Sequence, residues 1–220
     1  MDFNFPAIRR RLQLRVLKLR ARRAGLILLQ RGLILLSDDK TVAADVEDLN
    51  QEYETREKSI EQNALFTAVG LALSFWSQME ENLVAIVGML LRTKFSMAGL
   101  IMYSIINFHV RLNIIDELFS LSPDFGSLKP KWNKIHEKLK ELHDIRDRLA
   151  HHTVYSGGKP DDAALSPGRL DSRKKSQKHQ PLNREQIWDF TYRLTKVTND
   201  STDLINLMNK LDASLEKSSE

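Results

Sequence analysis

The chain contains no cysteine in its 220 residues. This absence excludes disulfide bonds, thiolate nucleophiles and zinc sites built on cysteine. It agrees with a reducing compartment, and we expect a cytoplasmic protein. Long apolar runs are also absent, because the longest, residues 24–36, is interrupted by Gln30 and Arg31. A membrane-spanning helix needs roughly 18 consecutive apolar residues, so the sequence predicts none.

The signatures of several enzyme classes are missing too. The sequence has no glycine-rich phosphate-binding loop, no nucleophile elbow and no His-x-x-x-His pair. His136 and His143 are seven residues apart, about 10.5 Å along a helix, which is too far for both to bind one metal ion directly. We therefore expect no metal and no cofactor. We interpret His136 and His143 as exposed helix residues and His109 as a core residue.

The body of the protein has no excess of positive charge. The whole chain has 33 Lys and Arg against 29 Asp and Glu. Nine of the basic residues lie within residues 1–36, where Asp2 is the one acid, so the rest of the chain has a net charge of −4. The overall charge of +4 therefore describes the N-terminal segment and is no evidence that the body binds RNA.

Residues 1–41 form a basic N-terminal extension that admits three interpretations. Its arginines lead into two Gly-Leu-Ile-Leu-Leu repeats, which begin at Gly25 and Gly32. The segment is an amphipathic helix that contacts a membrane or a partner, an Arg-rich and acid-poor targeting segment, or a poorly ordered or wrongly started N-terminus. All three interpretations stay open.

Residues 42–220 have helical periodicity and no convincing period-two alternation. A first helix is expected from about Val42 to Leu91, with Gly70 as a candidate bend. Apolar residues spaced near 3.6 positions predict a second helix over Phe95–Leu121. A turn punctuated by proline and glycine follows. A third helix is expected from about Pro130 to Ala150, since proline suits a first helical position.

The last helix is expected from about Arg184 to Leu215. Its apolar positions alternate gaps of three and four, a heptad seam broken at Ser201. Such a stripe is buried against other helices of the chain or across a dimer. Residues 156–182 are predicted to be a long mobile loop. The fold class is therefore all-α, a four-helix up-and-down bundle with an N-terminal basic extension.

Two further groups of residues have a structural interpretation beside a functional one. The basic run from Arg173 to His179 in the loop is a solvated linker or a phosphate-binding segment that steers RNA. The three tryptophans, Trp76, Trp132 and Trp188, are expected in packing positions in the core or an interface.

The end of the third helix has the sequence Arg146-Asp-Arg-Leu-Ala-His151. Five residues of an ideal helix turn through about 500°, so Arg146 and His151 point roughly 140° apart unless the helix frays near Ala150. A structural interpretation is also available, because basic residues suit the negative C-terminal pole of a helix. Asp144 and Arg148 have the spacing of an ordinary surface pair.

This segment resembles the Arg-x(4–6)-His motif of the HEPN superfamily. Asp147 is the polar residue that commonly follows the arginine, and Ala150 is a small residue before the histidine. The segment Phe75–Leu83 is similar to the first core helix of that family, and the resemblance covers about residues 60–215. It implies a HEPN-like bundle and a homodimer in which two copies of the motif meet.

The resemblance also implies a metal-independent endoribonuclease that acts on single-stranded RNA. An imidazole has a reference pKa of about 6.5, so it can accept or donate a proton near neutral pH. The resemblance therefore assigns to His151 the removal of the proton from the ribose 2′-hydroxyl or the donation of one to the leaving 5′-oxygen. Arg146 binds two phosphate oxygens, and Asp147 orients Arg146 or a histidine of the partner chain. Arg148 and His152 are expected as secondary phosphate contacts, and Glu80 as a partner of Arg146. The expected product is a 2′,3′-cyclic phosphate.

The resemblance implies a toxin or antiviral defence role, with an antitoxin protein as a possible partner. Two other functions compete with RNA cleavage. One is a non-catalytic helical module for dimerisation or partner binding, which uses the bundle and its heptad seam. The other is a protein docked on a membrane through its basic N-terminal extension.

Overall fold

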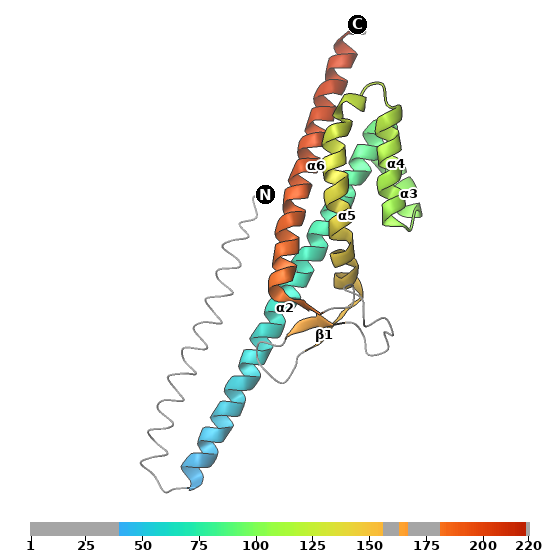
Figure 1. The fold of residues 1–220 in the computed structure, drawn as a ribbon. Coiled ribbons are helices and arrows are strands. Elements are labelled where there is room, and N and C mark those ends of the chain that lie inside the picture. Colours follow the sequence, from blue (N-terminus) through green and yellow to red (C-terminus); the bar gives the residue numbers. More distant parts are fainter. Residues whose placement is uncertain (1–39, 156–162, 167–180, 219–220) are drawn as a thin grey trace. The chain divides into compact units, whose positions relative to one another are not determined.

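A computed structural model describes residues 40–155, 163–166 and 181–218. Most of the N-terminal extension and the basic run from Arg173 to His179 lie outside these residues. The described chain is mostly helical, which confirms the all-α class, although a small three-stranded sheet is present (Figure 1). The helices are α2 (Lys40–Leu90), α3 (Phe95–Ser104), α4 (Phe108–Leu121), the short 3-10 helix η1 (Gly126–Leu128), α5 (Lys129–His151) and α6 (Arg184–Ser218).

The described residues divide into two compact units. The first contains residues 40–68, 152–155, 163–166 and 181–184, and the second contains residues 69–151 and 185–218. Helix α2 is one continuous helix, as the absence of proline predicted. No single helix of the described residues is long and apolar enough to cross a membrane. Residues 47–90 and α3 pass that test only as a pair bent by 116°.

The first unit contains a small antiparallel sheet. Its strands are β1 (Thr153–Tyr155), β2 (Ala164–Ser166) and β3 (Leu182–Asn183), in the order β1-β2-β3. Leu165 and Leu182 are paired across the sheet and buried. The prediction of a loop over residues 156–182 is therefore wrong for β2 and the start of β3, because strands this short show no readable alternation.

The second unit has a core of large apolar side chains from α2, α4, α5 and α6. The three predicted packing tryptophans are all buried in the structure. Trp76 contacts Phe108 and Phe190, with ring centroids 5.0 and 6.4 Å away. Most of the heptad seam of α6 is buried as well, namely Ile187, Phe190, Leu194, Val197, Ser201, Leu204 and Met208.

The break in the seam at Ser201 has a partner inside the chain. Asn82 of α2 donates to the Ser201 hydroxyl over 2.8 Å, and that hydroxyl donates to the Thr198 carbonyl over 2.7 Å. A buried hydroxyl costs free energy unless it is hydrogen-bonded, so these contacts explain how a polar residue is accommodated in the seam. The seam therefore packs within the second unit, and is not the free face that a dimer would need.

The single helix predicted for Phe95–Leu121 is wrong. The chain leaves helical geometry at Ile105–Asn107 and begins again as α4. The Asn107 side chain accepts hydrogen bonds from the backbone N–H of His109 and of Val110. Asparagine is a favoured N-cap because it satisfies the free N–H groups of a first turn. The apolar periodicity continues across the break, so the sequence pattern does not indicate it.

We expect the substitution Asn107→Ala to lower the free energy of unfolding by about 1 kcal/mol, because it removes this cap. Asn113→Ala is the matched control, since Asn113 is exposed within α4 and makes no cap. Urea denaturation of both variants measures the difference. Equal midpoints for the two variants would show that the cap does not stabilise α4.

Candidate functional site

The motif at the end of α5 lines a pocket of about 390 Å³ within the second unit. Three elements form its walls: α2, the segment that joins α3 to α4 together with the start of α4, and α5. The lining residues are Trp76, Glu80, Ile106, Asn107, Phe108, His109, Arg111, His143, Arg146, Asp147 and His151. The pocket therefore contains two guanidinium groups, three imidazoles and two carboxylates, most of which can bind or protonate an anion.

Arg146 is held from two sides. Its guanidinium carbon lies 5.9 Å from the centre of the Trp76 ring, within the range of a cation–π contact. Its Nη1 donates to Asp147 Oδ1 over 3.2 Å, as expected for a residue that orients the arginine. The Nε is buried and has no acceptor among the described residues.

His151 lines the same pocket and is exposed. We expected a regular helix to keep Arg146 and His151 apart. The helix continues to His151, yet both side chains line one pocket. The pocket extends along α5, where five residues span about 7.5 Å. No fraying of the helix is required for both residues to line this pocket.

Three expected contacts of the motif are placed differently by the structure. Glu80 lines the pocket, but its Oε1 accepts from Arg111 Nη1 over 3.0 Å, so the predicted pairing with Arg146 is wrong. Arg148 does not line the pocket, because it lies about 200° around α5 from Arg146. Burial lowers its pKa from the ordinary value for arginine. His152 belongs to the other unit and is not among the lining residues.

Arg111 is a site residue that sequence reasoning missed. Its Nη1 pairs with Glu80, and its Nε donates to the Ile105 carbonyl over 2.6 Å. The side chains of Arg111 and Glu80 are only 13 and 19 % exposed. The pair therefore joins α4 to α2 and to Ile105, the first residue of the α3–α4 break. It fixes the wall of the pocket that Ile106 to His109 form.

Three histidines were also interpreted wrongly. His143 is half-buried. Its ring is stacked on that of Phe108 with the centroids 4.8 Å apart, and its Nε2 lies 3.7 Å from Asp147 Oδ1. His109, expected in the core, is exposed and lies edge-on to His143 at 4.9 Å. His136, expected to be exposed, stacks on Trp132 at 5.7 Å. The break before α4 rotates His109 away from the core position that a continuous helix would give it.

The stability of the protein is expected to depend on pH through His136 and His143. Burial lowers the pKa of both imidazoles from their ordinary value, for His143 against the opposing effect of Asp147. The folded protein therefore binds fewer protons than the unfolded chain near pH 6.5, so the free energy of unfolding falls as the pH decreases from about 6.5 to the folded pKa values. Below the folded pKa values both imidazoles are protonated in the folded and the unfolded chain, and the free energy of unfolding falls no further through them.

Urea denaturation at pH 7.5 and pH 5.5 measures this effect. The double variant His136→Gln/His143→Gln is expected to lose less stability between these pH values than the unsubstituted protein. An equal loss in both proteins would assign the pH dependence to other groups.

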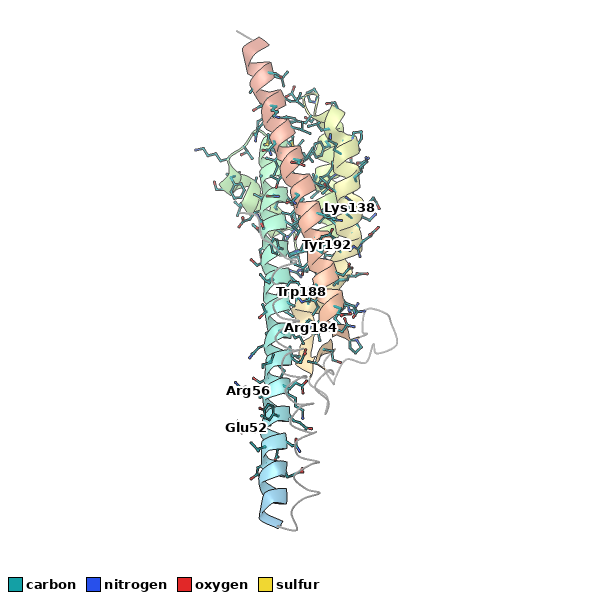
Figure 2. All side chains as sticks on the ribbon, turned by 90° about the vertical axis from the view of Figure 1, so that its left-hand side faces the viewer. Glu52, Arg56, Lys138, Arg184, Trp188 and Tyr192 are labelled. Carbon is teal, nitrogen blue, oxygen red and sulfur yellow. The ribbon has the colours of Figure 1, made fainter. Side chains whose placement is uncertain are left out.

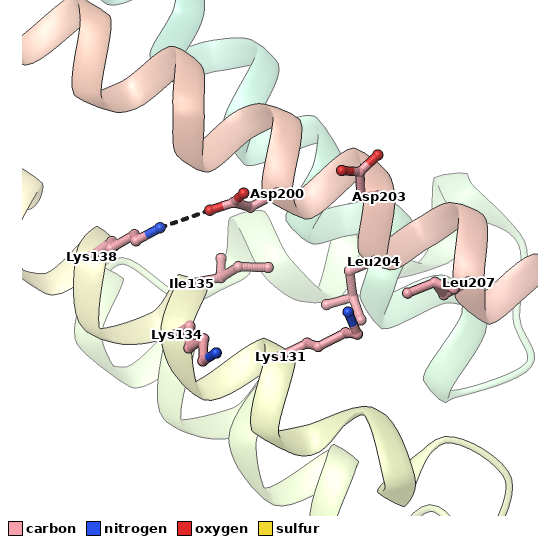
Figure 3. A pocket seen from close by; sticks show the side chains of 8 residues that line it. All are labelled: Lys131, Lys134, Ile135, Lys138, Asp200, Asp203, Leu204 and Leu207. Carbon is pink, nitrogen blue, oxygen red and sulfur yellow. Dashed lines mark hydrogen bonds and ion pairs between the residues drawn. The ribbon is translucent and has the colours of Figure 1, made fainter.

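A second pocket, of about 290 Å³, lies between α5 and α6 (Figure 3). Lys138 pairs with Asp200 at 2.7 Å, and both side chains are about half exposed. Such a pair contributes at most about 1 kcal/mol. This pocket contains no imidazole, so it offers no group that transfers protons near neutral pH. Its lining is Lys131, Lys134, Ile135, Lys138, Asp200, Asp203, Leu204 and Leu207.

The described residues contain no group of three or more His, Asp or Glu side chains arranged to hold a metal ion. Comparisons of the chain with models of protein families, with curated proteins and with solved structures gave no match. Of the two pockets, the one at the end of α5 has the residues for acid–base chemistry on an anion.

Proposed function

We propose that this protein is a metal-independent endoribonuclease of the HEPN type, which cleaves single-stranded RNA by attack of a ribose 2′-hydroxyl. One observation carries the proposal: Arg146 and His151 line the same pocket. A guanidinium and an imidazole at one site are the groups that this reaction needs, the first for the phosphate charge and the second for the proton.

The residues of the pocket have different roles in the proposed reaction. His151, which is exposed at the end of α5, accepts the proton of the 2′-hydroxyl or donates one to the leaving 5′-oxygen. The 2′-oxygen forms a bond to phosphorus while the bond to the 5′-oxygen breaks, and a 2′,3′-cyclic phosphate results. The Nη groups of Arg146 stabilise the negative charge that develops on the phosphate oxygens. Asp147 and Trp76 hold Arg146 in place.

The chemistry of the 2′-hydroxyl provides the test of this proposal. A short single-stranded RNA is incubated with the protein in EDTA, beside the same oligonucleotide with one 2′-deoxy nucleotide at the position that is cleaved. Cleavage of the first, with a 2′,3′-cyclic phosphate end, and survival of that bond in the second are expected. Cleavage next to the 2′-deoxy nucleotide, or a requirement for a metal ion, would contradict the proposed mechanism.

A non-catalytic module for dimerisation or partner binding is the second candidate. The observation that favours it is the set of large apolar side chains exposed on and after α3. It predicts stable association without turnover of RNA in the same assay. The proposed roles in toxin–antitoxin systems or antiviral defence, with RNA or an antitoxin protein as the partner, have only the resemblance of the motif as support.

A further inference from the structure

The pocket that contains Arg146 has imidazoles on both sides of that arginine along α5. His151 follows Arg146 by about 7.5 Å along the helix axis, and His143 precedes it by about 4.5 Å. In the proposed reaction the attacking 2′-oxygen loses a proton and the leaving 5′-oxygen gains one, and these two oxygens lie roughly in line through phosphorus. His151 therefore serves one of the two oxygens, and a second proton-transfer group is expected on the His143 side of Arg146.

The carboxylates of the pocket are engaged with its two arginines. Glu80 Oε1 accepts from Arg111 Nη1 over 3.0 Å, and Asp147 Oδ1 accepts from Arg146 Nη1 over 3.2 Å. These contacts use the carboxylates to hold the guanidinium groups. Among the described lining residues, the imidazoles are therefore the groups left for proton transfer near neutral pH.

Two imidazoles lie on the His143 side of Arg146, and His109 is the one that a substrate can reach. The half-buried His143 ring is covered on one face by Phe108, which is nearly parallel to it at 3°. The His143 Nε2 lies 3.7 Å from Asp147 Oδ1. His109 is exposed, lines the pocket and meets the His143 ring edge-on at 4.9 Å. His143 is therefore placed to support the His109 ring, and His109 is placed to contact RNA.

The packing of α4 against α5 brings His109 to this place. The two helices lie side by side (Figure 2). They run in opposite directions, because ring contacts join His109 to His143 and Phe119 to Trp132. The start of α4 therefore lies beside the second half of α5. The backbone N–H of His109 donates to the Oδ1 of the N-cap Asn107 over 2.9 Å, which fixes the first turn of α4 and the position of His109 within it.

We propose that His109 is a second catalytic residue of this pocket, which acts on the oxygen opposite to the one that His151 serves. One of the two imidazoles accepts the proton of the 2′-hydroxyl while the 2′-oxygen forms its bond to phosphorus. The other donates a proton to the 5′-oxygen while the bond from that oxygen to phosphorus breaks. The products are a 2′,3′-cyclic phosphate and a free 5′-hydroxyl, and the two imidazoles return to their first states by exchanging protons with water. Both groups come from one chain, and the inference rests on the proposed function.

A leaving group that needs no proton separates the roles of the two imidazoles. Single-turnover cleavage in EDTA is measured on a short single-stranded RNA and on the same RNA with sulfur in place of the bridging 5′-oxygen at the cleaved bond. His109→Gln and His151→Gln are each expected to slow cleavage of the ordinary RNA by about 100- to 10,000-fold. On the sulfur-containing RNA one of these variants is expected to be nearly as fast as the unsubstituted protein, because a thiolate leaves without being protonated. The other variant is expected to stay slow, since it lacks the group that accepts the 2′-hydroxyl proton.

Two more variants separate proton transfer from packing. His109→Phe keeps an aromatic ring beside His143 but has no nitrogen that exchanges a proton, so it is expected to be as slow as His109→Gln on the ordinary RNA. His136→Gln is the matched control, because His136 stacks on Trp132 and does not line the pocket. This control is expected to cleave both RNAs at the unsubstituted rate.

The results that would overturn the inference differ from those that would overturn the proposed function. Cleavage of ordinary RNA by His109→Gln or His109→Phe at the unsubstituted rate would contradict the role of His109 alone. So would recovery of both glutamine variants, or of neither, on the sulfur-containing RNA. If the unsubstituted protein cleaves neither RNA, the proposed function is wrong, and the role of His109 is wrong with it.

Discussion

The substitution Glu80→Leu is expected to lower the free energy of unfolding by about 3–5 kcal/mol, the cost of leaving a buried charge without its partner. Arg111 is 13 % exposed, and Glu80 is the carboxylate with which it pairs. Its Nε is already used by the Ile105 carbonyl, so the guanidinium cannot move to water without releasing the segment between α3 and α4. Chemical denaturation of the variant measures the loss.

The double variant Glu80→Leu/Arg111→Met is expected to recover part of this stability, because apolar residues of similar volume often replace a buried ion pair at little cost. The recovery will be incomplete, since the Ile105 carbonyl loses its donor. Glu81→Leu, at the exposed neighbouring position of α2, is the control and is expected to change stability by at most about 0.5 kcal/mol. If Glu80→Leu and Glu81→Leu unfold alike, the pair does not hold the wall of the pocket.

The substitution His151→Ala is expected to reduce RNA cleavage by about 100- to 10,000-fold, the usual contribution of a general acid or base. Arg146→Ala is expected to reduce it by about 100- to 1,000-fold, since it removes the donors that stabilise developing charge. Single-turnover rates in EDTA measure both effects. Circular dichroism shows whether each variant keeps its helical content, so that loss of activity is separated from loss of fold.

Two further variants make this result specific to the pocket. Arg146→Lys keeps the charge but not the paired Nη donors, and is expected to recover only a minor part of the activity. Arg193→Ala is the matched control, because Arg193 is an exposed guanidinium on α6 that pairs with Glu141 and does not line the pocket. Activity that survives both His151→Ala and Arg146→Ala would come from another site or from a contaminant.

The helices of this protein were largely predictable because their signals are local. The apolar periodicity and the lack of proline predicted α2, and the bounds expected for α5 and α6 differ from those observed by at most three residues. The break between α3 and α4 was missed because a single N-cap, Asn107, outweighs a periodicity that continues across it. The short strands β1, β2 and β3 were missed because pairing with distant residues, and not their own sequence, creates them.

The candidate site was predictable only in its sequential part. Arg146, Asp147 and His151 lie within six positions, and the resemblance of this segment to the HEPN motif made them candidates for one site. Arg111, Glu80 and the exposed His109 come from other elements, and no spacing in the sequence connects them with the motif. Periodicity placed His109 in the core, and the break before α4 moved it to the pocket.

The sequence by itself determined that the chain is mostly helical, which stripe of each long helix is buried, and that Arg146 and His151 are candidates for one site. Only the tertiary structure decided that these two residues share a pocket, that Arg111 and not Arg146 pairs with Glu80, and that α3 leaves most of its apolar surface exposed. The physical reason is the range of the interactions. Helix formation and capping act over a few residues of the chain, whereas ion pairs, pockets and exposed faces depend on which elements the packing brings together.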